Sequence, residues 1–144
     1  MPDDLLRLDD QFCFAVHSLA RAIVHAYEPL LAELDLTYPQ YLVLLVLWET
    51  NDVSLKALGC RLRLDSGTLT PLTKRLETKG LLSRTRSTAD ERELVVALTS
   101  AGRRLKQRAQ RVPAGILTCL GLPAGRLLKT RDELKAVLAA LELP

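Results

Sequence analysis

Residues 65–77 have the sequence DSGTLTPLTKRLE, and this stretch decides the fold of the chain. Asp65 or Ser66 can cap the start of a helix, and Gly80 is the glycine that commonly follows a helix end. Ser54 can cap a shorter helix, through about residue 62, just before it. Leucines recur at three- and four-residue steps and predict the buried face of the longer helix: Leu69, Leu72 and Leu76.

A β-ribbon is predicted directly after this pair of helices. Its strands are expected at residues 82–86 and 93–98, joined by a loop at residues 87–92. A helix followed by such a ribbon is typical of the winged helix-turn-helix, in which the helix enters the major groove and the wing contacts the backbone or the minor groove. We therefore predict a mainly α fold with a small β-ribbon, and a winged helix-turn-helix at 53–98 that binds double-stranded DNA.

Polar and basic side chains of this segment are the candidate DNA contacts. Short hydroxyls allow a helix to approach base edges closely, and lysine and arginine bind phosphates or guanines. Arg92 can enter the narrow minor groove from the tip of the wing, with its guanidinium held by Asp90. The predicted contacts are Ser66, Thr68, Thr70, Lys74, Arg75, Arg84, Arg86, Asp90 and Arg92.

Pro71 breaks a local rule of helix chemistry. It lacks the N–H that would bond the carbonyl of Gly67, and its ring presses towards that carbonyl. Such violations are expected where function constrains the sequence, although a proline early in a helix can also be harmless. The sequence leaves both explanations open.

The distribution of charge agrees with a phosphate-binding surface. Residues 54–92 hold nine Lys/Arg against four acids, a local charge of +5, whereas the whole chain is +3. With 144 residues and 48% hydrophobic composition, the chain is long enough for one domain with a real core, and we predict a single domain over residues 1–144. A localised basic face on a nearly neutral body suits DNA better than general adhesion.

The ends of the chain show no sign of export or membrane insertion. The first residues lack a signal-peptide pattern, and the longest apolar run, residues 41–48, is far shorter than the roughly 20 residues that span a bilayer. Three cysteines without a secretory segment indicate a reducing compartment. We expect a cytoplasmic protein with no membrane contact, no cofactor and no bound metal.

Amphipathic helices are predicted on both sides of the winged segment. The first, at residues 9–34, can be capped by Asp9 or Asp10 and bent by Pro29 in its last turn. A buried helix follows from Pro39, which suits a first helical position. Thr99 can cap a further helix.

We expect that further helix to run to about residue 112, where Pro113 and Gly115 break it, and a last helix near 127–141. The winged segment does not need these outer helices for its own core. We therefore predict a homodimer in which residues 9–34 and 113–144 form the dimerisation and sensing helices.

Several motifs resemble the MarR family of winged-helix regulators over essentially the whole chain. They are LDSGTLTPL at 64–72, DER at 90–92 and ALT at 97–99. Within that family, FCFA at 12–15, YEPLL at 27–31 and LTYPQY at 36–41 resemble the organic hydroperoxide resistance regulators, OhrR. The resemblance implies a dimeric repressor whose N-terminal cysteine is oxidised by organic hydroperoxides, after which the protein leaves a pseudo-palindromic operator.

Cys13 is the predicted sensing residue. Near the start of a helix, the helix dipole and the unpaired N–H groups favour a thiolate. The resemblance assigns thiolate activation to Tyr27 and Tyr38, and His17 stands where close relatives often have a third tyrosine. Tyr27 follows Cys13 by 14 residues, roughly 21 Å along one helix, so it can reach only the cysteine of a partner chain. The resemblance suggests the same for Tyr38.

Cys119 resembles the resolving cysteine of the two-cysteine OhrR branch, which implies an intersubunit disulfide with Cys13. We place it in the break between the last two helices, flanked by proline and glycine. A buried, inert Cys119 stays possible, in which case a small thiol would cap Cys13 instead. We interpret Cys60 as a packing residue. Apolar side chains around Cys13 predict a peroxide pocket that favours organic substrates: Phe12, Phe14 and Val16.

Three alternatives remain open from the sequence. A MarR-type repressor could be released by a small phenolic or lipophilic ligand instead of a peroxide. A metal sensor could use Cys13, His17, His25 and Cys119, although their spacing is unspecific. A thiol peroxidase lacks the expected redox scaffold, so we predict that the chain is not an enzyme.

Overall fold

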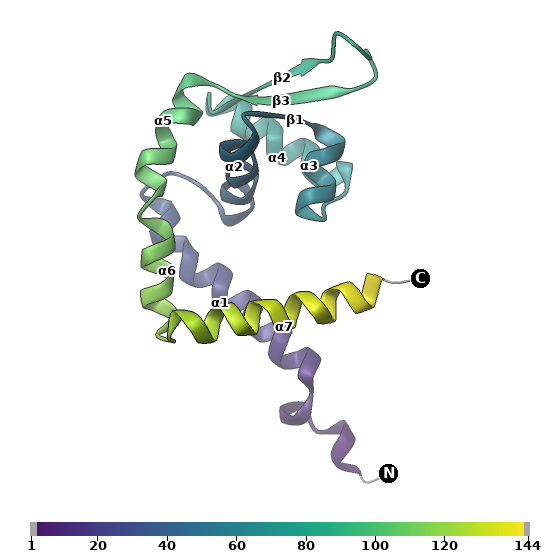
Figure 1. Ribbon diagram of the computed structural model, residues 1–144, viewed down its shortest axis with the longest axis vertical. Coiled ribbons are helices and arrows are strands. Elements are labelled where there is room, and N and C mark those ends of the chain that lie inside the picture. The colour runs from purple at the N-terminus through teal and green to yellow at the C-terminus, as the bar shows by residue number, and fades with distance from the viewer. Residues whose placement is uncertain (1–2, 143–144) are drawn as a thin grey trace. The chain divides into compact units, whose positions relative to one another are not determined.

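The structure is a computed structural model, and it describes residues 3–142 (Figure 1). The chain divides after Gln110 into two compact units, 1–110 and 111–144. The prediction of one domain over residues 1–144 stays a prediction. The first unit contains η1 (Asp3–Leu6), η2 (Leu8–Asp10), α1 (Phe12–Ala32), α2 (Tyr38–Thr50), β1 (Asp52–Ser54), α3 (Leu55–Leu62), α4 (Ser66–Thr78), β2 (Leu82–Arg86), β3 (Leu94–Leu98) and α5 (Ser100–Ala109). The second contains α6 (Val112–Leu120) and α7 (Ala124–Glu142).

Helix α1 begins three residues later than predicted. Asp9 and Asp10 lie in η2, so the prediction that one of them caps α1 is wrong. Gln11 is the N-cap residue, and its side-chain amide donates to the carbonyls of Leu5 and Arg7. This amide ties η1 and η2 to the start of α1. Pro29 lies inside α1, which continues to Ala32.

Helix α2 begins with a complete capping box. The Thr37 hydroxyl accepts from the backbone N–H of Gln40, and the Gln40 side chain accepts from the backbone N–H of Thr37. Pro39 occupies the first turn, as predicted. Six residues of α2 are buried, so this helix lies at the centre of the first unit.

The helix-turn-helix is formed by α3 and α4, with the predicted caps. Ser54 accepts from the N–H of Ala57, and Asp65 accepts from the N–H of Thr68 at 2.7 Å. A Cβ at Gly59 would lie 2.8 Å from the carbonyl oxygen of Leu64, so only glycine allows the turn to pack this closely against α3. The chain leaves α4 through Gly80 at a φ of 75°.

The sheet has three antiparallel strands in the order β1-β3-β2 (Figure 1). β2 agrees with the prediction, and β3 begins one residue later than expected. The prediction missed β1, because three residues are too short to show an alternating pattern. Val96 pairs with Val53 and with Arg84 and is fully buried, which fixes the ribbon to the helices beneath it.

The second unit differs from the prediction at its start. α5 ends at Ala109, and Pro113 occupies the first turn of α6 instead of breaking a helix. Cys119 lies in the last turn of α6, so its predicted place in the break between the last helices is wrong. The helix ends at Gly121, which has a φ of 62°. Proline at a helix start needs no N–H, which explains why it can begin α6 here.

Across residues 3–142, the structure contains no helix long and apolar enough to cross a membrane.

Candidate nucleic-acid interface and sensing cysteine

The recognition helix α4 is anchored by one buried face. Leu69, Leu72 and Leu76 are buried, as predicted, and Thr73 is buried between them. The Thr73 hydroxyl donates to the carbonyls of Leu69 at 3.0 Å and Thr70 at 3.1 Å. Because this face is fixed against the first unit, the opposite face of α4 is the one that can enter a DNA groove.

The predicted DNA contacts of α4 lie outside this buried face. Ser66, Thr68, Lys74 and Arg75 are exposed, whereas Thr70 is half-buried. Their role in DNA contact stays a prediction. The positions opposite the buried face also include Gly67 and Pro71, neither of which is among the predicted contacts, because these were chosen for polar or basic side chains.

Asp65 caps α4 at the edge of this surface. The hydrogen bond from the Thr68 N–H lowers the pKa of the Asp65 carboxyl below its usual value of 3.8. The carboxylate is therefore ionised at neutral pH and stabilises the first turn of the helix by accepting this bond.

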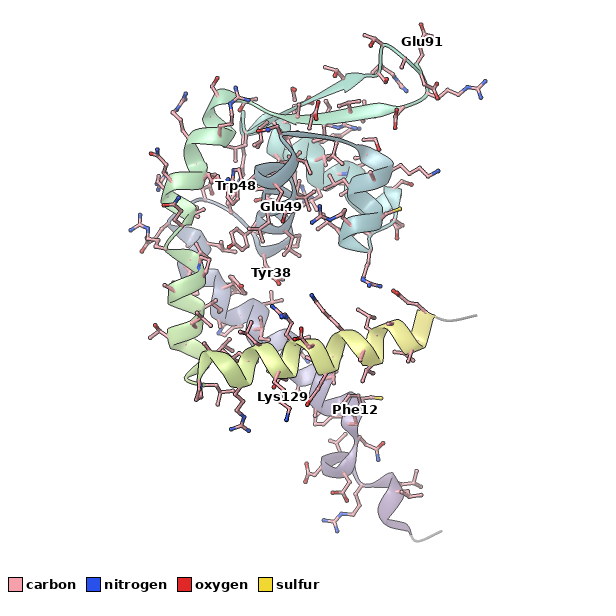
Figure 2. All side chains as sticks on the ribbon, viewed as in Figure 1. Phe12, Tyr38, Trp48, Glu49, Glu91 and Lys129 are labelled. Carbon is pink, nitrogen blue, oxygen red and sulfur yellow. The ribbon has the colours of Figure 1, made fainter. Side chains whose placement is uncertain are left out.

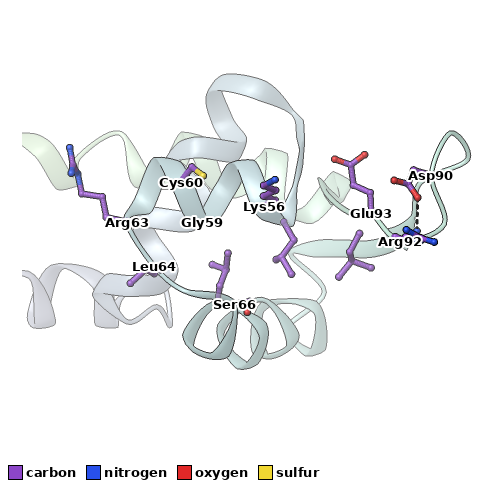
Figure 3. Close-up of a pocket in the computed structure, with 12 residues that line it drawn as sticks. Lys56, Gly59, Cys60, Arg63, Leu64, Ser66, Asp90, Arg92 and Glu93 are labelled. Atoms are coloured by element: carbon purple, nitrogen blue, oxygen red, sulfur yellow. Dashed lines mark hydrogen bonds between the residues drawn. The ribbon is translucent and has the colours of Figure 1, made fainter. Parts of the chain in front are cut away.

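The wing is held differently from the prediction. Asp90 Oδ1 accepts from the backbone N–H of Arg92 at 3.0 Å, and not from the guanidinium as expected (Figure 3). This bond is a local turn, which an aspartate forms readily with the backbone two residues on. In the described part of the chain, the guanidinium of Arg92 forms no ion pair. It is therefore available to an external anion.

The other wing arginines brace the ribbon. The Arg86 guanidinium donates to the carbonyl of Glu91 at 3.2 Å, across the loop whose tip is labelled in Figure 2. Arg84 is half-buried, and its backbone N–H donates to the Glu77 carboxylate at 2.9 Å. Within residues 3–142, Arg84 Nε is buried with no hydrogen-bond partner. Arg86 thus contacts protein through its guanidinium and Arg84 through its backbone N–H, and their contact with DNA stays a prediction.

A cleft of about 710 Å³ opens between α3, the start of α4 and the wing (Figure 3). Lys56, Arg63 and Arg92 line it together with the carboxylates of Asp90 and Glu93, so the cleft carries charges of both signs. Cys60 also lines the cleft and is exposed, so our interpretation of it as a packing residue is wrong. Its turn of α3 faces outward, because Leu58 and Gly59 fill the inner face.

The sensing candidate Cys13 lies in the first turn of α1 and is exposed. His17 follows one turn later and is also exposed. Phe12 is 58% exposed, Phe14 is 41% exposed and Val16 is half-buried. In the single chain this group is an open apolar surface around the thiol.

The two phenols assigned to thiolate activation lie together. The ring centroids of Tyr27 and Tyr38 are 4.7 Å apart, and Tyr41 lies 5.8 Å from Tyr27. Burial raises the pKa of Tyr27 to about 12, with a further contribution from Tyr38, and burial also raises the pKa of Tyr38. Like any tyrosine with a pKa of 10.0 or above, both phenols are protonated at neutral pH and can donate O–H bonds to an anion.

Cys13 and Tyr27 lie on one uninterrupted helix, α1. Their separation of 14 residues corresponds to roughly 21 Å along the axis. Tyr38 stacks on Tyr27, so it shares this distance from Cys13 of the same chain. Figure 2 labels Phe12 at the N-terminal end of α1 and Tyr38 at the start of α2.

Cys119 is exposed on α6, in the second unit. Among residues 3–142, no three His, Cys, Asp or Glu side chains gather closely enough to hold a metal ion. The thiols described here are therefore free side chains and not ligands of a cluster within this chain.

A family model of the transcriptional regulators SarA/Rot matches residues 25–109, which include the recognition helix and the wing. The chain belongs to this family of transcriptional regulators. Its fold is the winged helix of the MarR type, and the predicted fold class is confirmed.

Two curated relatives cover nearly the whole chain. The HTH-type transcriptional regulator TtmR of Methylorubrum extorquens is 50% identical over 99% of this chain and 76% of its own length. The organic hydroperoxide resistance transcriptional regulator of Bacillus subtilis is 44% identical over 96% of this chain and 89% of its own length. The resemblance to MarR and OhrR regulators is thereby confirmed, and these relatives are regulators and not enzymes.

Solved structures of the regulator AbfR are also similar. Reduced AbfR bound to DNA is 38% identical, covers 98% of this chain and 99% of its own chain, and superposes with a TM-score of 0.79. The disulfide form of AbfR superposes with a TM-score of 0.69, over 96% of this chain and 94% of its own. This member of the SarA/Rot family thus resembles a regulator that is known both on DNA and in an oxidised form.

Proposed function

We propose that this regulator is a homodimeric repressor that binds operator DNA when reduced and releases it when an organic hydroperoxide oxidises Cys13. One observation carries the proposal: two protonated phenols, Tyr27 and Tyr38, stack together roughly 21 Å from the exposed thiol on the same helix. Two neighbouring phenols can both donate hydrogen bonds to one anion, and Cys13 of their own chain lies too far away to be that anion. The cysteine of a second chain is such an anion.

The chemistry begins with the Cys13 thiolate. The sulfur attacks one peroxide oxygen, an S–O bond forms, the O–O bond breaks, and the alkoxide leaves and takes a proton to become the alcohol. The sulfur is oxidised to a sulfenic acid and the peroxide is reduced. Hydrogen bonds from Tyr27 and Tyr38 of the partner chain would stabilise the thiolate, and His17 at i+4 can contribute a further one.

Selectivity for organic peroxides follows from the surface around the thiol. Phe12 and Phe14 expose large apolar areas beside Cys13, and Val16 extends the patch. In a dimer these side chains would border a pocket for the organic group of the peroxide. Hydrogen peroxide has no such group to bury, so it gains nothing from this surface.

Cys119 is the proposed resolving residue. Its thiol would condense with the sulfenic acid of the partner's Cys13, forming an S–S bond and releasing water. Its exposure on α6 leaves it accessible to another thiol. The disulfide form of AbfR, a relative at 38% identity, supports a disulfide switch of this kind in this chain.

The operator is expected to be pseudo-palindromic, because two identical recognition helices of a dimer would contact two half-sites related by the same symmetry. Figure 1 shows one such helix, α4, beneath the ribbon formed by β2 and β3. The DNA-bound structures of AbfR support this mode of binding.

The test uses reduced protein on its operator and one equivalent of cumene hydroperoxide per chain. We expect wild type to release the DNA and Cys13→Ser to bind it equally well before and after treatment. Cys60→Ser, which changes an exposed thiol elsewhere, is the matched control and should respond as wild type. Release of DNA from Cys13→Ser would refute the proposal and favour a repressor that responds to a ligand.

The resolving step has its own measurement. After the same treatment, a non-reducing gel should show a linked dimer for wild type and none for Cys119→Ser. A linked dimer in Cys119→Ser would assign resolution to another thiol.

A further inference from the structure

The outward-facing positions of α4 include two residues without polar side chains, Gly67 and Pro71. Leu69, Leu72, Thr73 and Leu76 are buried and fix the inner face of the helix. At 3.6 residues per turn, the positions opposite this face are all exposed: Gly67, Pro71, Lys74 and Thr78. The part of α4 that projects furthest from the protein therefore begins with a residue that has no side chain and one that has an apolar ring.

The backbone conformation of Gly67 does not require glycine, because its φ is not positive. A Cβ there would lie 3.2 Å from Asp65 Oδ1, the oxygen that caps α4, and would meet no other atom within 4 Å. Glycine in a helix costs stability relative to alanine. At an exposed position opposite the buried face, it leaves the backbone of the helix open to close approach by another molecule.

Pro71 changes the backbone chemistry of the same surface. It has no N–H, so the carbonyl of Gly67, one turn earlier, loses its helical donor. The helix still runs unbroken over Ser66–Thr78, because its buried side chains hold both halves in place. The outer face of α4 thus presents an acceptor without its helical partner, next to an apolar ring.

These two groups match what the major groove displays. Adenine N6 and cytosine N4 carry amine donors there, and thymine carries a methyl group. We propose that Gly67 and Pro71 form the base-contacting surface of α4. The Gly67 carbonyl accepts a hydrogen bond from an exocyclic amine, and the Pro71 ring packs on a thymine methyl of a neighbouring base pair. Lys74, one turn further, contacts the phosphate backbone.

This inference rests on DNA binding by the family and not on oxidation of Cys13. All measurements therefore use reduced protein, and their outcome is independent of the proposed redox response. The probe is a duplex selected by the wild-type protein from a random library, compared with a scrambled duplex of the same length and composition.

The first test is Gly67→Ala, measured by fluorescence anisotropy on both duplexes. We expect affinity for the selected duplex to fall about tenfold or more, because the added Cβ holds the helix off the bases, while the scrambled duplex binds as before. Gly125→Ala is the matched control. Gly125 is also the second residue of its helix, and a Cβ there meets nothing within 4 Å. Gly67→Ala with wild-type affinity, or with equal losses on both duplexes, would overturn the role of Gly67.

The second test is Pro71→Ala, which returns the N–H to the helix and so cannot fail by breaking it. We expect it to lose preference for the selected duplex. Replacing one thymine per half-site by deoxyuridine removes only the methyl group. It should lower the affinity of the wild-type protein for the duplex and leave the affinity of Pro71→Ala unchanged. A purine without its amine, or a cytosine analogue without N4, identifies the partner of the Gly67 carbonyl in the same way. Selection of the same duplex with the same affinity by Pro71→Ala would refute the proposal.

Discussion

Tyr27 is a half-buried phenol that serves as a hydrogen-bond donor in the proposed mechanism. It lies in α1, stacks on Tyr38 at 4.7 Å and approaches Tyr41 at 5.8 Å. Burial next to two other phenols keeps it protonated to about pH 12. A group that stays neutral can donate a hydrogen bond across the whole physiological range, which is what stabilisation of a neighbouring thiolate requires.

The first residue-scale prediction concerns rate. Tyr27→Phe keeps the ring stack and removes the hydroxyl, so we expect Cys13 to react with cumene hydroperoxide about tenfold more slowly, the effect of one charge-assisted hydrogen bond. The measurement is the second-order rate of thiol loss under reducing-agent-free conditions. Tyr41→Phe, in the same aromatic cluster, is the control and should react as wild type. Equal rates for all three proteins would remove Tyr27 from the mechanism.

The raised pKa of Tyr27 also predicts the direction of alkaline unfolding. The folded protein holds this proton up to about pH 12, whereas the unfolded chain releases it near 10.0. The folded state therefore binds more protons between these values, and the free energy of unfolding should fall as pH rises from 10 to 12. In urea titrations, the free energy of unfolding of Tyr27→Phe should fall less between pH 10 and 12 than that of wild type. An identical fall in both proteins would contradict the assignment.

At the scale of the element, α4 depends on its cap. The Asp65 carboxylate accepts from Thr68 at 2.7 Å, and this bond lowers its pKa below 3.8. The stabilisation it provides is present above pH 3.8 and is lost as pH falls through the lowered value. The recognition helix is thus the element of the first unit whose start is sensitive to acid.

Asp65→Asn tests this dependence. Asparagine also caps helices but does not titrate, so we expect its stability below pH 4 to fall less steeply than that of wild type. Helical circular dichroism during urea unfolding at pH 3 to 7 measures the difference. If the free energy of unfolding fell equally with pH in both proteins, another carboxylate would dominate acid unfolding.

A second element-scale link connects α4 to the turn between α1 and α2. Lys79, at the C-cap of α4, donates to the carbonyl of Asp35, and its ammonium lies 3.2 Å from the Asp35 carboxylate. Asp35 follows α1 with a φ of 54°, in the turn before α2. The end of the recognition helix is therefore tied to the connection between the helices that carry Tyr27 and Tyr38.

At the scale of the whole molecule, the long helix α1 keeps the Cys13 thiol and the Tyr27 phenol of one chain far apart. This separation predicts complementation between chains. A Cys13→Ser chain mixed with a Tyr27→Phe chain should form heterodimers in which the remaining Cys13 meets an intact Tyr27, with a wild-type oxidation rate. The double variant Cys13→Ser/Tyr27→Phe mixed with wild type should give heterodimers with the slow rate. The reverse pattern would place thiol and phenol in the same chain.

Much of this architecture follows from local chemistry. The caps Ser54, Asp65 and Thr99 each accept the backbone bond expected of them, and the ribbon strands lie within one residue of their predicted positions. Capping and turn residues act over three or four positions, so sequence alone reveals them. The proposed sensing cysteine and its candidate phenols were predicted from short motifs that resemble a family.

Other features depend on contacts between distant segments. Burial of Tyr27 beside Tyr38, exposure of Cys60 in a cleft and the pairing of β1 with β3 join residues far apart in the chain. Asp90 bonds a backbone N–H instead of a guanidinium because the loop geometry brings that group closer. Local sequence signals were enough to place the helix-turn-helix and the ribbon, because caps and alternating strands act over a few residues, but not α6, which begins at a proline expected to break a helix. The tertiary structure set which face of α4 projects outward and how far the pKa of Tyr27 rises above 10.0, because exposure and pKa depend on what surrounds a group in space.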